Sequence, residues 1–194
     1  MQTKFWTISN ALSLSRIFLM TPVIYFFLSP IAHNREYAIL FILLAVITDA
    51  LDGYFARLFK QETEIGRIID PLADKIGVGI VVVLLLYFGD ISVWFALLVI
   101  LRDAIIFLGG LILKIRKGII LPSNLPGKFA VAFVALTLVL AMTRYHIFWF
   151  AMHASLFVSV ILLLVSFAVY IRRFYKVMKA STNENIAFQK GDQH

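Results

Sequence analysis

Long apolar segments alternate with short polar segments along the chain of 194 residues. Each apolar segment approaches the roughly 20 residues that an α-helix needs to cross the hydrocarbon core of a bilayer. The pattern therefore predicts an all-α polytopic integral membrane protein with six transmembrane helices. We expect these spans at about residues 12–30, 36–57, 71–89, 91–113, 128–143 and 147–171.

The two ends of the chain are less uniformly apolar than the segments between them. Residues 1–14 mix aromatic and aliphatic side chains with Ser, Thr and Asn, which is typical of a short interfacial helix ahead of the first span. From Arg172 onward the chain is polar and basic. We expect a single membrane domain over residues 1–180, followed by a polar cytoplasmic tail over residues 181–194 that is partly disordered.

Composition supports a membrane location. The chain is 61% hydrophobic and 15% charged, and its mean hydropathy is +0.92. A soluble domain of this length is far less apolar. The absence of cysteine excludes disulfides and thiolate metal sites. Most of the basic residues behind the net charge of +7 lie in loops and in the tail, which favours contact with anionic lipid over binding of nucleic acid.

The distribution of Lys and Arg predicts the orientation in the membrane. Six spans place both termini on one side, and cytoplasmic loops carry the excess of positive charge. Only Arg35 and Arg144 fall in loops on the other side. Eleven basic residues fall on the side of the termini: Lys4, Lys60, Arg67, Lys114, Arg116, Lys117, Arg172, Arg173, Lys176, Lys179 and Lys190. We therefore expect both termini and the loop over residues 58–70 to face the cytoplasm.

Four aspartates interrupt or border the second and third predicted spans. A charged side chain near the centre of a bilayer costs roughly 2.5–3.5 kcal/mol, so four of them close together require a functional reason. Asp49 and Asp52 are three residues apart, and Asp70 and Asp74 are four apart, so each pair shares one helix face. Two antiparallel helices would bring the four carboxylates together near the cytoplasmic surface. Oxygen ligands in this number favour a hard divalent cation such as Mg²⁺ or Mn²⁺.

The aspartates belong to a longer pattern with fixed spacing. It reads Asp49-x2-Asp52-Gly53-x2-Ala56-Arg57-x8-Gly66-x3-Asp70-x3-Asp74. At every fixed position this pattern resembles the signature of the CDP-alcohol phosphatidyltransferase family, whose enzymes transfer a phosphatidyl or similar group from a CDP-alcohol to a second alcohol and release CMP. The resemblance implies a homodimeric enzyme of the plasma or inner membrane, with CDP-diacylglycerol as lipid substrate and a site that faces the cytoplasm.

The resemblance also implies roles for the motif residues. It implies that two divalent cations, Mg²⁺ or Mn²⁺, are bound by Asp49, Asp52, Asp70 and Asp74, and that Asp74 also acts as general base. It implies that the CDP moiety contacts six residues of the two helices and their connecting loop: Asp52, Gly53, Ala56, Arg57, Thr63 and Gly66. The sequence leaves open whether Asp74 serves chiefly as base or as ligand, because burial raises its affinity for a proton and nearby cations lower it.

Three motif residues also have a purely structural interpretation. Gly53 lets a nucleotide approach the helix closely and Ala56 keeps the same face open, but small residues also serve helix packing. Within the full motif we favour the functional interpretation of these two. Asp70 precedes Pro71 and could cap the N-terminus of the third span, in addition to or instead of binding a metal.

Arg102 is a basic residue deep within the fourth predicted span. It either binds an anion in a water-filled cavity or pairs with one of the motif aspartates. A pair between Arg102 and Asp103 is disfavoured, because neighbouring residues do not share a helix face. Lys128 begins the fifth span at the cytoplasmic surface. We expect Arg102 and Lys128 to bind the phosphate of the acceptor alcohol.

The amino-acid sequences of two segments bear on the identity of the acceptor alcohol. GRIIDPLADK around Asp70 and LRDAII around Arg102 look most like phosphatidylglycerophosphate synthases and the related cardiolipin synthases. The first group uses glycerol 3-phosphate and the second uses phosphatidylglycerol. The basic residues favour a phosphorylated acceptor, and therefore glycerol 3-phosphate. Cardiolipin, phosphatidylserine and phosphatidylinositol-phosphate synthases remain alternatives, because they share the core motif and Asp103 stands where the first group is expected to have glutamate.

A cation transporter is the alternative from a different functional class, because intramembrane carboxylates also line ion pathways. Here the four aspartates cluster near one surface, and the outer halves of the spans are apolar. The repeated halves that many transporters show are not apparent. The sequence therefore favours an enzyme over a transporter.

Overall fold

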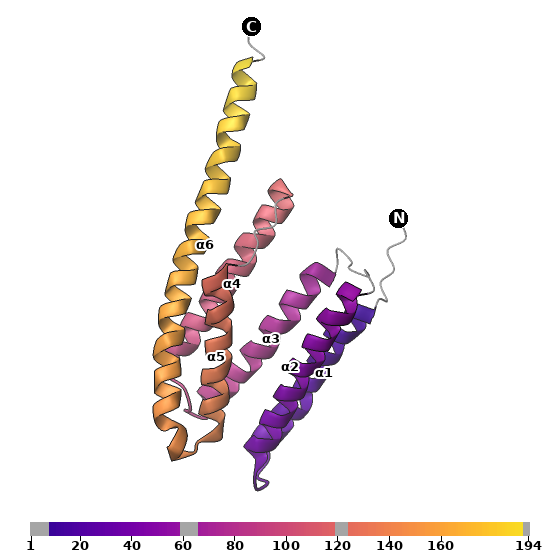
Figure 1. Ribbon diagram of the computed structural model, residues 1–194, viewed down its shortest axis with the longest axis vertical. Coiled ribbons are helices and arrows are strands. Elements are labelled where there is room, and N and C mark those ends of the chain that lie inside the picture. Colours follow the sequence, from indigo (N-terminus) through magenta and orange to yellow (C-terminus); the bar gives the residue numbers. More distant parts are fainter. Residues whose placement is uncertain (1–7, 59–65, 119–123, 192–194) are drawn as a thin grey trace. The chain divides into compact units, whose positions relative to one another are not determined.

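The computed structural model describes residues 8–58, 66–118 and 124–191, and all of its regular elements are helices (Figure 1). Side chains are described over residues 18–48, 75–115 and 124–179. The elements are α1 (Ile8–Leu28), α2 (Asn34–Leu58), α3 (Gly66–Tyr87), α4 (Val93–Lys117), α5 (Leu125–Thr143), a single 3₁₀ turn η1 (His146–Phe148) and α6 (Trp149–Gly191). The described ranges contain no β-strand, which confirms the all-α prediction.

Several helices have the length and composition of membrane spans. Within the described residues, three stretches are long and apolar enough to cross a bilayer: Val93–Ile115, Leu125–Thr143 and His146–Lys179. Two shorter apolar stretches are Phe18–Leu28 and Lys75–Tyr87. Large apolar side chains such as Tyr87, Ile115 and Phe150 are exposed on these helices, as expected where lipid replaces water as the surrounding medium. The count of six spans stays a prediction.

The chain forms two compact units. The first comprises Met1–Ala96 and Leu138–Met152, and the second comprises Leu97–Thr137 and His153–His194. In the first unit, α1 packs against both α2 and α3 (Figure 1). The buried side chains here are large and apolar, and they include Val23, Phe27, Val82 and Leu85. Close packing of these side chains holds α1 and α3 in this unit.

In the second unit, hydroxyl groups join the helices. The Thr137 and Ser155 hydroxyls lie 2.8 Å apart and link α5 to α6. The Tyr170 hydroxyl of α6 donates to the backbone oxygen of Ile106 on α4 at 3.1 Å. Gly109 makes this approach possible, because a Cβ there would lie 2.5 Å from the Tyr170 oxygen. Small residues and interhelical hydrogen bonds of this kind are the usual means of packing helices within a membrane.

The structure bears on two predictions about the chain ends. Helix α1 begins at Ile8 and continues unbroken to Leu28; residues 1–7 lie outside the described part, so the interfacial helix ahead of the first span stays a prediction. At the other end, α6 continues to Gly191, whereas we expected partial disorder beyond Ala180. Residues 172–190 contain no glycine or proline, so their polarity does not prevent them from extending the helix. The domain limits at residues 1–180 and 181–194 stay a prediction.

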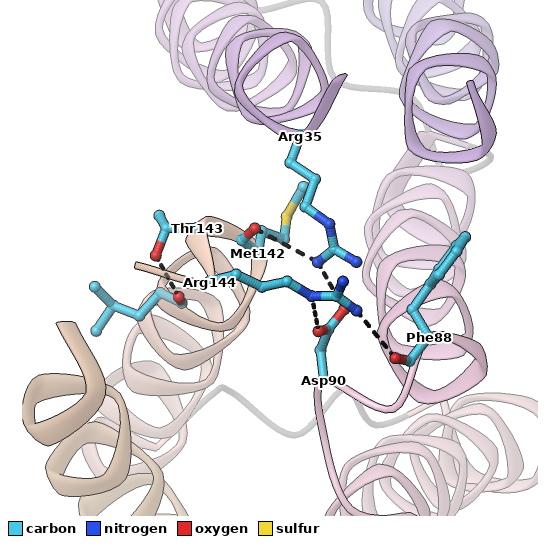
Figure 2. Close-up of polar contacts among 7 residues, drawn as sticks. Arg35, Phe88, Asp90, Met142, Thr143 and Arg144 are labelled. Atoms are coloured by element: carbon cyan, nitrogen blue, oxygen red, sulfur yellow. Dashed lines mark hydrogen bonds and ion pairs between the residues drawn. The ribbon is translucent and has the colours of Figure 1, made fainter. Parts of the chain in front are cut away.

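A buried carboxylate, Asp90, fixes one end of the first unit (Figure 2). Arg35 Nη1 lies 2.6 Å from Asp90 Oδ2, and Arg144 Nε lies 2.5 Å from Asp90 Oδ1. Arg144 also donates to the Phe88 backbone oxygen at 3.0 Å, and Arg35 donates to that of Met142 at 3.5 Å. We refer to Arg35, Asp90 and Arg144 as the Asp90 cluster. Its hydrogen bonds tie the start of α2, the turn after α3 and the end of α5 to one another.

Aromatic and polar contacts reinforce the Asp90 cluster. The Arg35 guanidinium lies 4.8 Å from the ring centre of Phe27 and 5.5 Å from that of Phe88, both within the range of cation–π attraction. The Tyr145 hydroxyl donates to Glu36 Oε1 at 2.6 Å. This hydrogen bond raises the pKa of the Tyr145 phenol. The start of α2 is therefore held beside the end of α3. The chain runs away from the cluster along α2 and toward it along α3.

Candidate active site

The two halves of the motif lie on two consecutive helices of the first unit. The first half occupies the last turns of α2: Asp49, Asp52, Gly53, Ala56 and Arg57. The second half occupies the first turns of α3: Gly66, Asp70 and Asp74. Thr63 lies outside the described residues. Each aspartate pair therefore lies in one uninterrupted helix, as the spacing predicted.

The distances of the two motif halves from the Asp90 cluster, measured along their helices, can be compared. Asp49 follows Arg35 by 14 residues, which corresponds to about 21 Å along a helix. Asp74 precedes Tyr87, the last residue of α3, by 13 residues, or about 20 Å at the same rise per residue. From these lengths we expect the backbones at Asp49 and Asp74 to lie within about one helical turn of the same level. The side chains of residues 49–74 lie outside the described ones, so the grouping of the four carboxylates stays a prediction.

The structural interpretation of Asp70 as a helix cap is wrong. Helix α3 begins at Gly66, so Asp70 lies more than one turn inside the helix. An N-cap residue precedes the first turn and accepts hydrogen bonds from its free backbone N–H groups. Asp70 is not at that position, and a capping role therefore does not account for a carboxylate here.

Arg102 lies on α4 in the second unit and is only 8% exposed. Its Nη1 lies 2.6 Å from Asp103 Oδ1, and its Nη2 donates to the Ser166 hydroxyl at 2.5 Å. The prediction that disfavoured a pair with Asp103 is wrong. Neighbouring Cβ atoms do point about 100° apart on a helix, but an arginine side chain is long and flexible enough to bend around to the next residue.

One donor of the buried guanidinium has no hydrogen bond. Arg102 Nε is inaccessible to solvent and donates to no acceptor in the described part of the chain. Leaving a buried donor without an acceptor costs about 1–3 kcal/mol. Asp103 balances the charge of Arg102 but accepts its hydrogen bond from Nη1 and not from Nε. A phosphate or other anion with several acceptor oxygens would complete the hydrogen bonding of Arg102.

The start of α5 lies next to Arg102. Asn124 Oδ1 accepts a hydrogen bond from the backbone N–H of Gly127 at 2.6 Å, which caps the first turn of α5. A Cβ on Gly127 would lie 2.5 Å from that Asn124 oxygen and 3.5 Å from Arg102 Nη2. Lys128 follows immediately and is exposed. The structure thus brings the turn that carries Lys128 close to Arg102, as expected if both contact one anion.

Two residues near Arg102 were not singled out from the sequence. Ser166 is fully buried on α6, and Asn124 Nδ2 donates to its backbone oxygen at 3.3 Å. A serine within the apolar run LLLVSFAVY and an asparagine ahead of Pro126-Gly127 were the available signals. Neither signal indicates a partner, because the contact joins residues that are far apart in the chain.

The fold and the motif together define a class of protein. Membrane-length apolar helices, with paired carboxylates on two consecutive helices, are typical of an integral membrane enzyme. A family model described as CDP-alcohol phosphatidyltransferase matches residues 6–171. The chain belongs to this family, and it is therefore a membrane-bound transferase of phospholipid biosynthesis.

Individual relatives carry more specific names. The chain is 32% identical over 177 residues to a CDP-diacylglycerol–glycerol-3-phosphate 3-phosphatidyltransferase of Aquifex aeolicus, covering 88% of this chain and 97% of that protein. It is 29% identical to a protein of the same name from Mycoplasma pneumoniae, covering 70% of this chain and 65% of the relative. A protein from Mycobacterium bovis, named as a candidate cardiolipin synthase, is 31% identical over 66% of this chain and 61% of its own length.

Proposed function

We propose that this chain is a phosphatidylglycerophosphate synthase, which transfers the phosphatidyl group of CDP-diacylglycerol to glycerol 3-phosphate. The observation that carries the proposal is the similarity to the Aquifex aeolicus enzyme, which extends over 97% of that protein. Arg102 is buried beside the turn of Lys128 and has a nitrogen without an acceptor in the described part of the chain, which also supports a phosphorylated acceptor.

The reaction exchanges one phosphorus–oxygen bond for another. The acceptor hydroxyl oxygen attacks the phosphorus that carries diacylglycerol, and the bond from this phosphorus to CMP breaks. Asp74 accepts the proton that the hydroxyl loses. CMP leaves with the bridging oxygen and its electron pair, and the lipid product keeps the phosphate of glycerol 3-phosphate.

The motif aspartates suit divalent metal ions. Enzymes of this family generally depend on such ions, and the donor set of Asp49, Asp52, Asp70 and Asp74 offers only oxygen, as Mg²⁺ and Mn²⁺ prefer. We assign these four residues as the ligands of two ions. When bound, such ions neutralise the diphosphate and the charge that develops on departing CMP.

The remaining motif residues contact the CDP moiety in this proposal. Gly53 and Ala56 have little or no side chain, so the nucleotide can lie close to the backbone of α2. Arg57 pairs with the diphosphate. Asp52, Thr63 and Gly66 complete the contacts to CDP.

Arg102 and Lys128 bind the phosphate of the acceptor in this proposal. Arg102 is held by Asp103 and Ser166 through two of its nitrogens, and its Nε donor is free among the described residues. The exposed Lys128 supplies a second positive charge. A charge-assisted hydrogen bond from each would favour glycerol 3-phosphate over an uncharged alcohol.

The proposed setting is a homodimer in the plasma or inner membrane, with six spans in each protomer. The excess of Lys and Arg on the side of the termini supports an active site and termini that face the cytoplasm. Glycerol 3-phosphate is water-soluble, so a site that opens to the cytoplasm would be accessible to it.

Cardiolipin synthase is the second candidate, because the Mycobacterium bovis relative carries that name. A panel of acceptors separates the two. Purified protein, CDP-diacylglycerol and Mg²⁺ or Mn²⁺ are combined in turn with glycerol 3-phosphate, phosphatidylglycerol, serine and inositol phosphate, and CMP release is measured. We expect glycerol 3-phosphate to give the fastest release. Release with phosphatidylglycerol alone would assign the chain as a cardiolipin synthase instead.

A further inference from the structure

The hydrogen bonds of Arg102 continue beyond the residues assigned so far. Ser166 on α6 is fully buried, and its hydroxyl accepts from Arg102 Nη2 at 2.5 Å. The same hydroxyl donates to the backbone oxygen of Leu163 at 3.2 Å. Because the hydroxyl hydrogen is committed to α6 itself, a lone pair of the oxygen is directed to Arg102. Ser166 therefore fixes one nitrogen of the guanidinium relative to α6.

Asn124 connects the same serine to the start of α5. Its side-chain oxygen caps α5 through the Gly127 N–H, and its side-chain nitrogen donates to the Ser166 backbone oxygen. The backbone N–H of Lys128 in turn donates to the Asn124 backbone oxygen at 3.1 Å. One asparagine thus links the turn that carries Lys128 to the residue that holds Arg102.

We propose that Ser166 and Asn124 are positioning residues for the acceptor phosphate. Ser166 holds the Arg102 guanidinium beside the first turn of α5, and Asn124 fixes the turn that carries Lys128 next to it. The proposal rests on the proposed function, since it assumes that Arg102 and Lys128 bind the acceptor. Neither Ser166 nor Asn124 touches the reacting atoms, so both act through the side chains of Arg102 and Lys128.

A merely structural role makes a different prediction. If Ser166 only satisfies a buried guanidinium, its loss should lower the stability of the protein and reduce the amount of active enzyme. Such a loss reduces kcat and leaves each KM unchanged. A positioning role instead raises the KM for the acceptor and leaves the KM for CDP-diacylglycerol unchanged.

The test compares two buried serines of α6. Ser166→Ala removes the hydroxyl that contacts Arg102. Ser159→Ala is the matched control, since Ser159 is equally buried and its hydroxyl donates to its own helix at Leu156, with Arg102 not among its hydrogen-bond partners. We expect Ser166→Ala to raise the KM for glycerol 3-phosphate about tenfold, the effect of one hydrogen bond to a charged group. The control should leave both KM values within about twofold, since it removes only a hydrogen bond within its own helix.

A second variant separates capping from positioning. Asn124→Ser keeps a side-chain oxygen that can cap α5, but it lacks the amide donor that reaches Ser166. We expect the KM for glycerol 3-phosphate to rise in this variant as well. Thermal unfolding of the detergent-solubilised protein checks the helix cap. An unfolding temperature of Asn124→Ser equal to that of the wild type would show that the cap is intact.

Measurements in the Arg102→Ala background show whether Ser166 acts through Arg102. We expect Ser166→Ala to add no further increase in KM there, because a positioning residue has no effect once its target is removed. An equal increase in both backgrounds would overturn the proposal. So would a rise with Arg102→Ala but none with Ser166→Ala. If Arg102→Ala itself left the acceptor KM unchanged, the proposed role of Arg102 would fail instead.

Discussion

At the scale of single residues, buried charges are matched to specific partners. Asp90 is 6% exposed on its side chain and is held by two arginines. Arg102 is held by one carboxylate and one hydroxyl, with one donor left free among the described residues. The first arrangement is complete within the protein and is therefore structural. The second is incomplete, which is the physical reason for assigning it to a ligand.

Arg102→Ala should weaken acceptor binding selectively. The loss of hydrogen bonds from a charged group is worth roughly 1.5–3 kcal/mol, or about 10–150-fold in the KM for glycerol 3-phosphate. The KM for CDP-diacylglycerol should change little. Steady-state kinetics with each substrate varied in turn would measure both values. A larger effect on the lipid substrate would contradict the assignment.

Asp74→Asn should reduce kcat by about 10²–10⁴, the usual contribution of a positioned base. Asparagine is nearly isosteric and can still offer one oxygen to a metal, but it cannot accept the proton. Asp49→Asn should instead weaken metal binding, so added Mg²⁺ should restore part of its activity. A metal titration of kcat for both variants in one detergent compares them. Equal rescue of the two would show that Asp74 is chiefly a ligand.

At the scale of helices, the Asp90 cluster determines how α2 and α3 are aligned. It holds the first residues of α2 beside the turn that follows α3. The two motif halves lie at the opposite ends of these helices, about 20 Å along them. A change in the register of either helix would therefore shift the two aspartate pairs relative to each other. We therefore expect the cluster to influence the site without being part of it.

Loss of the buried ion pair should destabilise the protein. Arg35→Ala leaves Asp90 without its more buried partner, and because Arg144 still pairs with Asp90, the cost should stay below the roughly 3–5 kcal/mol of a buried charge left unpaired. Arg144→Ala is the matched comparison, because its side chain is 52% exposed, compared with 12% for Arg35. A smaller loss is expected for Arg144→Ala, because water already surrounds about half of this side chain and weakens its attraction to Asp90. Thermal unfolding in detergent measures both. A larger decrease for Arg144→Ala would contradict this account.

The hydropathy of the sequence predicted helices more reliably than it predicted contacts. Hydropathy identified α4, α5 and the apolar part of α6, because insertion into lipid depends on local composition. The motif could be recognised for a similar reason, since its spacing lies within two consecutive helices. The contacts of Arg102 with Asp103 and Ser166 could not be predicted. The first depends on how a long side chain bends, and the second on which helices pack together.

At the scale of the whole molecule, orientation in the membrane is the main feature that remains a prediction. The chain has no cysteine, so single introduced cysteines can be labelled without a background. Ser181→Cys reports on the C-terminal tail, and Ile147→Cys reports on the turn between α5 and α6, where the side chain is exposed. With a membrane-impermeant maleimide, we expect labelling of Ile147→Cys in intact cells and of Ser181→Cys only after permeabilisation. The reverse pattern would place the site on the outer face.

The central claim is the transfer of a phosphatidyl group to glycerol 3-phosphate, and the transfer of label tests it most directly. Purified protein is incubated with CDP-diacylglycerol, Mg²⁺ and radiolabelled glycerol 3-phosphate, and the lipid is extracted into organic solvent. We predict that label enters the lipid fraction in equal amount to the CMP released, and that excess chelator prevents both. Release of CMP while all of the label stays in the aqueous phase would contradict the claim.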